Sequence, residues 1–542
     1  MITDRSFRTH LDPEKTNRFR VLLKLRIVYI CSYNRMTMHN ILGFFIFFSL
    51  VTQQLMSQVI PGERKMLNYR LIGFSFPPVS GADSYRLEIA AGSCSNEKEF
   101  EKNIFKHLKT NTNRLIAEVP SFGKQYTWRV SAVKGTSVNT KSPLHHFSTG
   151  IIPEADTAVT RMRILKNAAT YKDAYVFVDG TRALYDMRGN PVWYLPDIDS
   201  LSTADCYPRD MKLTPQGTIT ILIHKGIYEL NYDAEILWKM PKNAHRSPDS
   251  VEFYHHEFTR LANGHYMTLG DEKLLCQKPA STDSNFALLP MEKALPNGTY
   301  SNDRMSFGTI IEYDENNRQV WAWKSSDYFK KSDIYFHKIA SGFVDVHENA
   351  FYFDEKNKAA YLSFKGIDRI VKVNYPEGNV INAYGEKYKP GMGEPGNKLF
   401  CGQHSCRRSS DGYLYLFNNN FCNPASWPTL VMMKENPNTG KLEKIWEYEC
   451  DVNYVGIRSP KPYSFGIGGN VFELPDKSFL ASLSGSCTNI FIVNRDKKLL
   501  WSAVCERWSP ETKQWNPILN YRASMITSRA DMDRLIWNSV KK

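Results

Sequence analysis

Short segments in which apolar and polar residues alternate run through most of the chain, separated by turns rich in Gly, Asn and Asp. Because successive side chains of a strand point to opposite faces, this period of two predicts β-strands, and helical periodicity is scarce. After residue 170 one signature recurs: an Asn/Asp-rich turn followed by an apolar strand that ends in Trp. Its copies stand at Trp193, Trp238, Trp321, Trp446 and Trp501.

A further copy, EGNVINAYG, keeps the turn and the strand but lacks the Trp, so the unit occurs six times. A second signature, strand–turn–strand, precedes these copies, as in HEFTRLANGHYMTLGDE from His256. Four-stranded units of about 45–60 residues in tandem are typical of a propeller, because one blade cannot bury both of its faces. The chain is therefore predicted to be all-β, with a six-bladed β-propeller over residues 171–542.

Residues 58–150 contain a separate set of predicted strands, Leu71–Phe76, Tyr85–Ala90 and Tyr126–Val133, divided by turns. They predict a small β-sandwich that precedes the propeller, with residues 151–170 as a linker. The run FSFPPVSGADSYRLEIA followed by YTWRVSAV resembles a fibronectin type III domain. That resemblance implies a spacer and says little about chemistry.

The first 57 residues are predicted to form a leader segment. Ile41 to Val51 is an uncharged apolar run, preceded by Met36 and Met38 and followed by small polar residues. The run is too short to span about 30 Å of hydrocarbon, so it predicts a signal peptide rather than a membrane anchor. We therefore expect an exported protein, periplasmic or secreted, with no stable membrane span in the mature chain.

The formal net charge is +13 and stays positive when the leader is set aside. A positive balance suits anionic substrates, whereas no Lys/Arg run, zinc pattern or RNP-like motif supports a nucleic-acid partner. Export permits disulfides among the cysteines. Cys401 and Cys406 bracket His404, and a local disulfide between them is favoured over zinc ligation.

Three repeats carry a polar residue at one shared position. Counting back eight residues from the turn glycine of each unit gives Arg209, His256 and His404, while His347 begins the corresponding strand before a longer turn. In the last unit, Gly469 stands at the corresponding position. Because the innermost strands of a propeller line its central channel, these side chains are predicted to converge in one cavity.

Several chemistries suit such a pocket. Imidazoles bind metals, act as nucleophiles or transfer protons. Asn349 and Lys365 add neutral and cationic donors, whereas Glu257 and Glu348 are turned to the opposite face by strand alternation. A pocket rich in donors without a carboxylate base favours an oxyanion and transfer of an anionic group. The sequence contains no phosphate-binding loop of the kind that binds nucleotides, so a nucleotide donor is not expected. No metal and no other cofactor is expected either.

The segments YHHEFTRLANGHYMTL, DVHENAFYFDEKNKAAYLSFK and GQHSCRRSSDGYLYLFNNN resemble the bacterial arylsulfate sulfotransferase family over most of residues 170–530. The resemblance implies an exported six-bladed propeller that moves a sulfuryl group from an aryl sulfate to a phenol without a nucleotide donor. It implies that His404 is the nucleophile, transiently sulfated in a ping-pong reaction. His256 and His347, with Asn349, would bind the sulfuryl oxygens or protonate the leaving phenolate.

The remaining assignments rest on the same resemblance. Arg209, Lys365 and Tyr521 are expected to bind substrate, Tyr521 by its likeness to a family tyrosine near the aromatic ring. The chain departs from the family where Lys365 replaces an arginine and Ser405 an acidic residue, and Arg369 is a candidate to supply the missing guanidinium. The expected partners are a small aryl sulfate and a phenol, with a homodimer left open.

Two other functions fit the same pattern. A histidine-lined propeller with a cationic pocket also suits a metal-dependent polysaccharide lyase. An exported propeller with an additional sandwich domain also suits a non-catalytic protein that binds a glycan or a protein partner.

Overall fold

The computed structural model describes residues 59–203, 207–223, 226–241, 245–247, 250–251, 253–279, 287–290, 300–329, 343–385, 399–420, 427–450, 468–484 and 489–540. These residues form mostly β-structure, as the period-two pattern predicts. The apolar run Ile41–Val51 lies outside the described residues. Within them, no helix combines the length and the hydropathy needed to span a bilayer.

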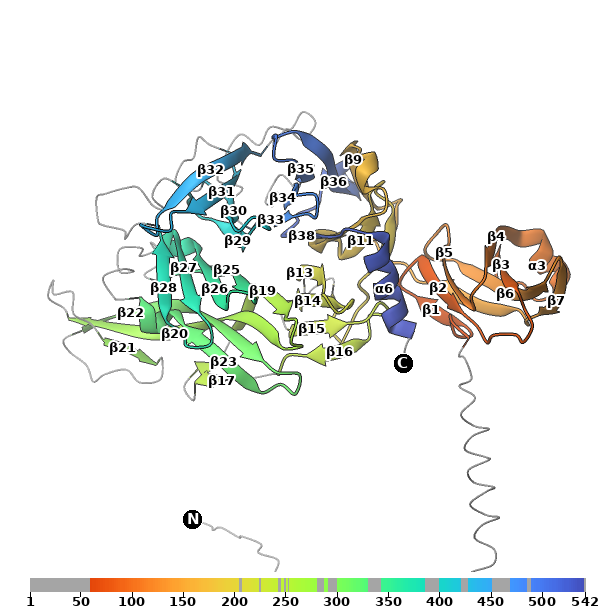
Figure 1. Ribbon diagram of the computed structural model, residues 1–542, viewed down its shortest axis with the longest axis horizontal. Coiled ribbons are helices and arrows are strands. Elements are labelled where there is room, and N and C mark those ends of the chain that lie inside the picture. Colours follow the sequence, from red (N-terminus) through yellow and green to blue (C-terminus); the bar gives the residue numbers. More distant parts are fainter. Residues whose placement is uncertain are drawn as a thin grey trace, which may run out of the picture.

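After residue 170, antiparallel sheets follow one another along the chain and stand around a common centre (Figure 1). One sheet has the order β13 (Pro208–Leu213), β14 (Ile219–Ile223), β15 (Gly226–Leu230), β16 (Ile236–Lys239). The next has β19 (Phe253–Arg260), β20 (Tyr266–Pro279), β22 (Tyr300–Tyr313), β23 (Gln319–Lys324), with β21 (Ala287–Pro290) and β24 (Phe343–Asp345) attached to its long strands. A small hairpin, β17 (His245–Ser247) and β18 (Ser250–Val251), lies between them in sequence.

The following sheets repeat this plan, each with its first strand nearest the centre (Figure 1). They comprise β25 (Glu348–Asp354), β26 (Ala359–Phe364), β27 (Arg369–Asn374), β28 (Val380–Tyr384); then β29 (His404–Arg408), β30 (Leu414–Asn418), β31 (Thr429–Glu435), β32 (Leu442–Glu449). The last sheet comprises β33 (Asn470–Glu473), β34 (Phe479–Ser482), β35 (Asn489–Val493), β36 (Leu499–Ser509), β37 (Gln514–Pro517). This order of sheets is the one that the sequence repeats predict.

The two ends of this region interlock. The strands β10 (Tyr175–Val178), β11 (Ala183–Asp186) and β12 (Pro191–Tyr194) are completed by β38 (Ala523–Ile526), which pairs with β10. In turn β9 (Thr160–Lys166) pairs with β36 of the last sheet. The expected linker over residues 151–170 is therefore wrong in this part, because Met162 and Ile164 alternate on β9 and pack into the core of that sheet.

The repeated Trp has a structural role in joining neighbouring sheets. The indole N–H of the outer strand donates a hydrogen bond to a carbonyl in the outer turn of the next sheet, and the last sheet does the same to the first. The pairs are Trp193 with Tyr232 (2.7 Å), Trp321 with Pro376 (2.8 Å), Trp446 with Arg495 (2.7 Å) and Trp501 with Met187 (3.1 Å). A buried Trp usually needs a partner for its N–H, and the repeat supplies one at these four positions. At Trp238, the remaining copy, the indole N–H has no partner among the described residues.

The N-terminal unit has two sheets that face each other. One contains β1 (Lys65–Leu67), β8 (His145–Thr149), β6 (Gln125–Lys134), β3 (Ser84–Ala91), β4 (Ile104–Thr110) and β7 (Ser137–Lys141). The other pairs β2 (Leu71–Ser75) with β5 (Arg114–Glu118), and the short helix α3 (Glu97–Asn103) follows β3. Phe74 of β2 packs edge-on against Trp128 and Phe147, with ring centroids 5.1 and 6.1 Å apart.

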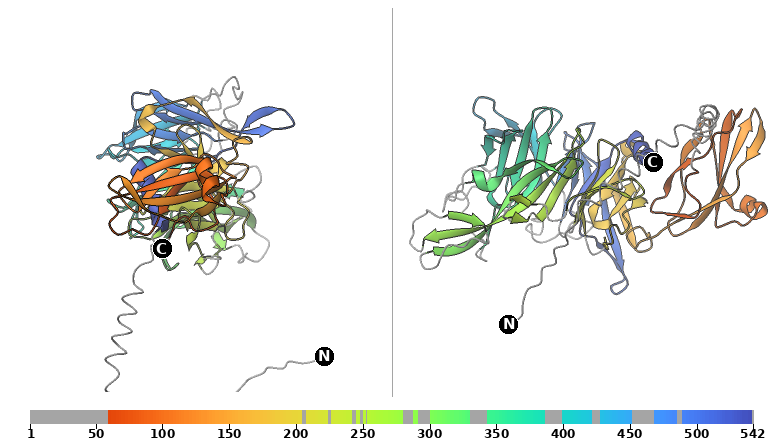
Figure 2. Two further views of the ribbon diagram at one scale, coloured as in Figure 1. Left: turned by 90° about the vertical axis from the view of Figure 1, so that its right-hand side faces the viewer. Right: turned by 90° about the horizontal axis from the view of Figure 1, so that it is seen from below.

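This unit projects from one side of the ring of sheets and packs directly against it (Figure 2). Tyr69 forms a β-bridge with Trp193 and stacks on Tyr232 at 4.4 Å. The helix α6 (Arg529–Val540) contacts β2, where a Cβ on Gly73 would come within 2.9 Å of Ile536. The two parts of the chain therefore share one hydrophobic core.

Candidate functional site

The predicted site residues come together at the centre of the ring. A cavity of about 610 Å³ is lined by His256, His347, His404, Arg209, Lys365 and Tyr521, together with Tyr207, Gly468, Ser484, Leu519 and Asn520. Asn349 does not line it. Its side chain is fully buried, and Nδ2 donates to the carbonyl of Gln403 at 2.7 Å, so Asn349 supports the loop before His404.

The inner strands turn their polar side chains into this cavity through bulges. His256 and His347 have positive φ angles of 61° and 50°. Asp210 and Ser405, which directly follow Arg209 and His404, have φ angles of 58° and 53°. The hairpin register shifts at three of these points, beside Arg209, His256 and His404. Non-glycine residues in this region are rare and often mark functional sites, because a bulge re-aims a side chain.

His404 is held in one tautomer. Its Nδ1 lies 2.7 Å from Oδ1 of Asn419 and 3.3 Å from the carbonyl of Gly402, and both atoms are acceptors. Asn419 is itself oriented, since its Nδ2 donates to the carbonyl of Gly468 at 3.0 Å. Nδ1 therefore carries the proton, and Nε2 keeps its lone pair for a molecule in the cavity.

The electrostatic surroundings keep this imidazole neutral. Burial and the positive charge of Lys365 lower the pKa of His404 well below its ordinary value, against a smaller opposing effect of the Asn419 hydrogen bond. Burial, together with His255 and His347, also lowers the pKa of His256 well below the ordinary range. A neutral imidazole with a free Nε2 is suited to nucleophilic attack.

The other rings lie close to one another. His256 and His347 meet edge to face with centroids 5.1 Å apart, and Tyr521 lies 6.1 Å from His256. The guanidinium of Arg209 covers the Tyr521 ring at 5.1 Å, and burial raises the pKa of this phenol. Within the described residues, the Tyr521 hydroxyl has no hydrogen-bond partner, so it is available to a ligand.

Lys365 supplies a cation beside His404. It begins a 3-10 turn, η4 (Lys365–Ile367), and its backbone N–H donates to the carbonyl of His347 at 2.9 Å. Asp368 ends the turn in a left-handed conformation and accepts the backbone N–H of Gly402 at 2.6 Å. The turn therefore joins the elements that carry His347 and His404. Arg369 lies on β27 and does not line the cavity, so Lys365 is the residue placed to contact an anion.

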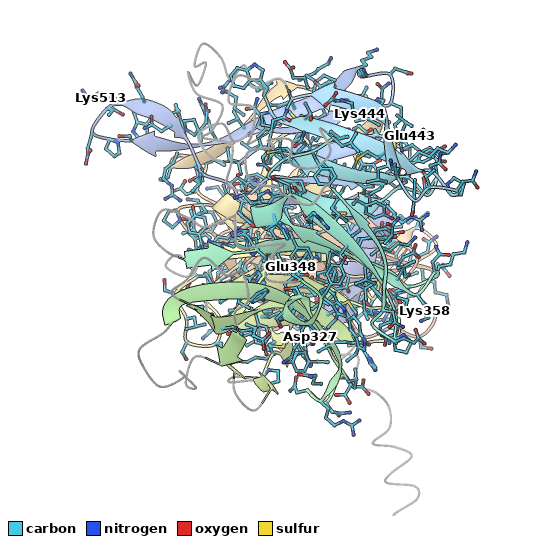
Figure 3. The ribbon with its side chains drawn as sticks, turned by 90° about the vertical axis from the view of Figure 1, so that its left-hand side faces the viewer. Asp327, Glu348, Lys358, Glu443, Lys444 and Lys513 are labelled. Carbon is cyan, nitrogen blue, oxygen red and sulfur yellow. The ribbon has the colours of Figure 1, made fainter. Side chains whose placement is uncertain are left out.

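The residues that follow the cavity residues bind the neighbouring inner strand. Glu257 and Glu348, expected to turn away from the cavity, are both buried and do not line it. Lys513, by contrast, projects from the edge of the molecule (Figure 3). Ser405 makes the same kind of contact with a hydroxyl in place of a carboxylate. The hydrogen bonds run from Phe258 N to Asp210 Oδ2 (3.0 Å), from Phe351 N to Glu257 Oε2 (3.2 Å) and from Val471 N to Ser405 Oγ (3.2 Å).

A buried arginine neutralises two of these carboxylates. Arg522, with 2 % of its side chain exposed, lies 3.0 Å from Asp210 Oδ1 and 3.7 Å from Glu257 Oε2. It also donates to the carbonyl of Asn349 at 3.1 Å. Arg407 forms a further ion pair with Glu257. Buried charges require such pairing, so this network holds the inner strands in place beneath the cavity.

The predicted disulfide between Cys401 and Cys406 is wrong. Cys401 is disulfide-bonded, but Cys406 is a free thiol, fully buried on β29 beside Leu416 and Val431. Burial raises the pKa of the Cys406 thiol. Strand alternation turns this side chain into the core of its sheet, which the closeness of the two cysteines in sequence does not reveal.

Sequence reasoning missed three residues of the site. Asn419, within the NNN run after β30, orients the His404 ring; His255 contacts His256; and Arg522 pairs with the carboxylates below the cavity. The only available signals were that NNN closes the strand opposite His404 and that His255 adjoins His256. Among the described residues, no three His, Cys, Asp or Glu side chains are grouped so as to hold a metal ion.

Solved structures similar to the chain have low identity. A protein of unknown function from Bacteroides caccae shares 10 % identity, covers 68 % of this chain and 98 % of its own, and has a TM-score of 0.34. A periplasmic gluconolactonase from Pseudomonas aeruginosa shares 9 %, with 68 % and 99 % coverage and a TM-score of 0.35. The β-propeller domain of Cps50 (Swd1) from Myceliophteria thermophila shares 9 %, with 68 % and 97 % coverage and a TM-score of 0.34.

None of these likenesses identifies the chemistry of the cavity. No curated protein matches the chain. The family model described as arylsulfotransferase (ASST) matches residues 157–466, which include every cavity histidine and Lys365. The chain therefore belongs to the arylsulfotransferase (ASST) family and is a transferase.

Proposed function

We propose that this arylsulfotransferase works by a ping-pong reaction in which His404 Nε2 carries the sulfuryl group. The observation that supports the proposal most directly is the hydrogen bond between His404 Nδ1 and Asn419, which leaves Nε2 as the nucleophilic nitrogen. In the same proposal the sheets after residue 170 are six blades of a propeller, and residues 58–150 are a fibronectin type III-like sandwich. The protein is exported by the leader, and a homodimer stays open.

In the donor half-reaction, the Nε2 lone pair of His404 attacks the sulfur of an aryl sulfate. The N–S bond forms, the S–O bond to the aryl oxygen breaks, and the phenolate takes up a proton as it leaves. In the acceptor half-reaction, a second phenol loses its proton, its oxygen attacks the same sulfur, and the N–S electron pair returns to Nε2. Lys365 and the histidine N–H groups stabilise the negative charge of the sulfuryl oxygens.

The lining of the cavity also supports the proposal of an aromatic substrate. Tyr521 presents its ring and an unbonded hydroxyl to the cavity, and Tyr207 and Leu519 lie at its edge with 42 % and 59 % of their surfaces exposed. Apolar groups beside a cationic floor suit a molecule with an aryl ring at one end and a sulfate at the other. Arg209 stacks on Tyr521 and is placed to attract the anion as it enters.

The test is the intact mass of the protein after exposure to 4-nitrophenyl sulfate without an acceptor. We expect a gain of one SO₃ unit that maps to His404 and disappears when a phenol is added. His404→Gln abolishes the adduct, whereas His265→Gln, on the same sheet as His256 but bonded to Glu312, retains it. An adduct on another residue, or turnover without an adduct, contradicts the proposal.

A further inference from the structure

His256 is linked on its far side to a second histidine and then to a carboxylate. His256 Nδ1 lies 2.5 Å from Nδ1 of His255, and the two rings are perpendicular. His255 Nε2 lies 3.0 Å from Oδ1 of Asp271. Of the three, His256 lines the cavity. The chain Asp271–His255–His256, here called the relay, therefore leads from a partly exposed carboxylate to the cavity.

The strand geometry explains why adjacent histidines touch. In a regular strand His255 and His256 would point to opposite faces. The bulge between His255 and Phe258, with the left-handed φ of His256, brings the two rings together. On the paired strand β20, Asp271 stands opposite Phe253, two residues from His255 on the same face. Diagonal neighbours of this kind are within reach of long or aromatic side chains.

The protons of the relay follow from these contacts. Two Nδ1 atoms 2.5 Å apart share one proton, because neither two donors nor two lone pairs tolerate that distance. Burial alone would raise the pKa of Asp271, but the charge and hydrogen bond of His255, with the charge of His347, hold it below the ordinary value. Asp271 is therefore a carboxylate, and its negative charge, 3.0 Å from Nε2 of His255, favours a proton on that nitrogen.

The relay then has two states that differ by one proton. In one state His255 is an imidazolium that donates from Nδ1 to His256, and His256 carries its proton on Nε2. In the other, His255 is neutral and accepts from His256 Nδ1–H, so that Nε2 of His256 has a lone pair. In both states Nε2 of His255 lies beside the Asp271 carboxylate. Around His256, burial, His347, His404 and Arg522 all disfavour a cation.

A ping-pong sulfuryl transfer needs a group that holds a proton between its two steps. One phenolate gains a proton in the first half-reaction, and one phenol loses a proton in the second. We infer that His255, held by Asp271, stores this proton and passes it through His256. When the donor reacts, His256 Nε2–H protonates the leaving oxygen, and the His255 Nδ1 proton moves to His256 Nδ1. When the acceptor reacts, its proton enters at His256 Nε2, and the Nδ1 proton returns to His255.

This inference rests on the proposed sulfuryl transfer and makes His255 and Asp271 positioning and proton-storing residues. Its test compares two donors in single-turnover formation of the sulfated enzyme. The 4-nitrophenolate group leaves without a proton, whereas phenolate is a much stronger base and needs one. In His255→Asn and in Asp271→Asn, we expect the rate with phenyl sulfate to fall on the order of 10²-fold and the rate with 4-nitrophenyl sulfate to change by less than about threefold.

Two control variants and a comparison of melting temperatures separate the outcomes. Asp271→Glu restores most of the phenyl sulfate rate, because a carboxylate is again present, and His265→Gln leaves both donors unchanged. Equal losses with both donors in a variant that melts like the wild type would overturn the relay, and so would no loss with either. Absence of a sulfated wild-type enzyme with 4-nitrophenyl sulfate would instead refute the proposed function itself.

Discussion

The chemistry of the site depends on which nitrogen of His404 carries the proton. Asn419 decides this, because its Oδ1 accepts from Nδ1 and its own Nδ2 is tied to the carbonyl of Gly468. The cation at Lys365 then suppresses protonation of the free nitrogen. One hydrogen bond and one charge therefore favour a neutral imidazole with a free Nε2, which suits the nucleophile proposed above.

Replacing Asn419 with Leu removes the acceptor that fixes this tautomer. We expect formation of the sulfated enzyme to slow by about 10²-fold or more, as for other histidines held in the wrong tautomer. The measurement is the single-turnover rate with 4-nitrophenyl sulfate. Asn419→Asp retains an acceptor and serves as the matched variant, so an equal loss in both would contradict this role.

Lys365→Met should change the pH dependence of the same step. Wild-type His404 is neutral through the neutral range because burial and Lys365 lower its pKa, while His347 and Arg522 act in the same direction and Asn419 opposes them. Removing the cation raises the pKa of His404, so protonation blocks the nucleophile at a higher pH. We expect the acid limb of the rate profile to move upward, and an unmoved limb would exclude this effect of Lys365.

At the scale of the elements, three inner strands, β13, β19 and β29, perform two tasks with adjacent residues. One residue of the bulge faces the cavity, and the next binds the backbone of the neighbouring strand. Ser405 shows that the second task does not require a charge, since its hydroxyl serves where Asp210 and Glu257 use carboxylates. The carboxylates in turn require Arg522, which lies below the cavity.

Loss of Arg522 should therefore destabilise the folded protein. Arg522→Met leaves Asp210 and Glu257 with fewer partners in the interior, and we expect a loss of about 3–5 kcal/mol in the free energy of unfolding. Arg529→Met removes an exposed pair with Asp533 and should cost less than about 1 kcal/mol. Thermal or denaturant unfolding measures both, and similar losses in the two variants would contradict the importance of the buried network.

At the scale of the whole molecule, the N-terminal unit and the ring of sheets share a core around Trp193. Trp193 is fully buried, lies edge-on to Phe177 at 5.8 Å and donates to the carbonyl of Tyr232. Tyr232 in turn stacks on Tyr69 of the N-terminal unit and donates from its hydroxyl to the carbonyl of Leu71. The sequence suggests a spacer, whereas the contacts show a unit that is packed into the rest.

Such packing predicts cooperative unfolding. Trp193→Ala should destabilise the protein by about 3–5 kcal/mol, because it opens a large cavity where the two parts meet. Calorimetry should show one transition for the wild type and one, at lower temperature, for the variant. A separate transition for the N-terminal unit, unaffected by the substitution, would show that the two parts unfold independently.

The sequence predicts well those features of the fold and the site that recur from one repeat to the next. The Trp position recurs because four of the five indoles donate a hydrogen bond to the next sheet. The register of His256 and His404 recurs because both inner strands carry a bulge. The single contacts do not repeat and were missed: Asn419 reaches His404 from the neighbouring strand, and strand alternation would send His255 away from His256. Likewise β9 pairs with a strand far along the chain, Arg161 and Glu506 being 345 positions apart.

The pairing of β38 with β10 has a consequence for the timing of assembly. Asn520 and Tyr521, which line the cavity, immediately precede β38, so they reach their places only when that strand docks beside β10. A growing chain that already contains all three cavity histidines but ends before Asn520 still lacks part of the cavity lining. We therefore expect the proposed sulfuryl transfer to begin only after β38 has paired with β10.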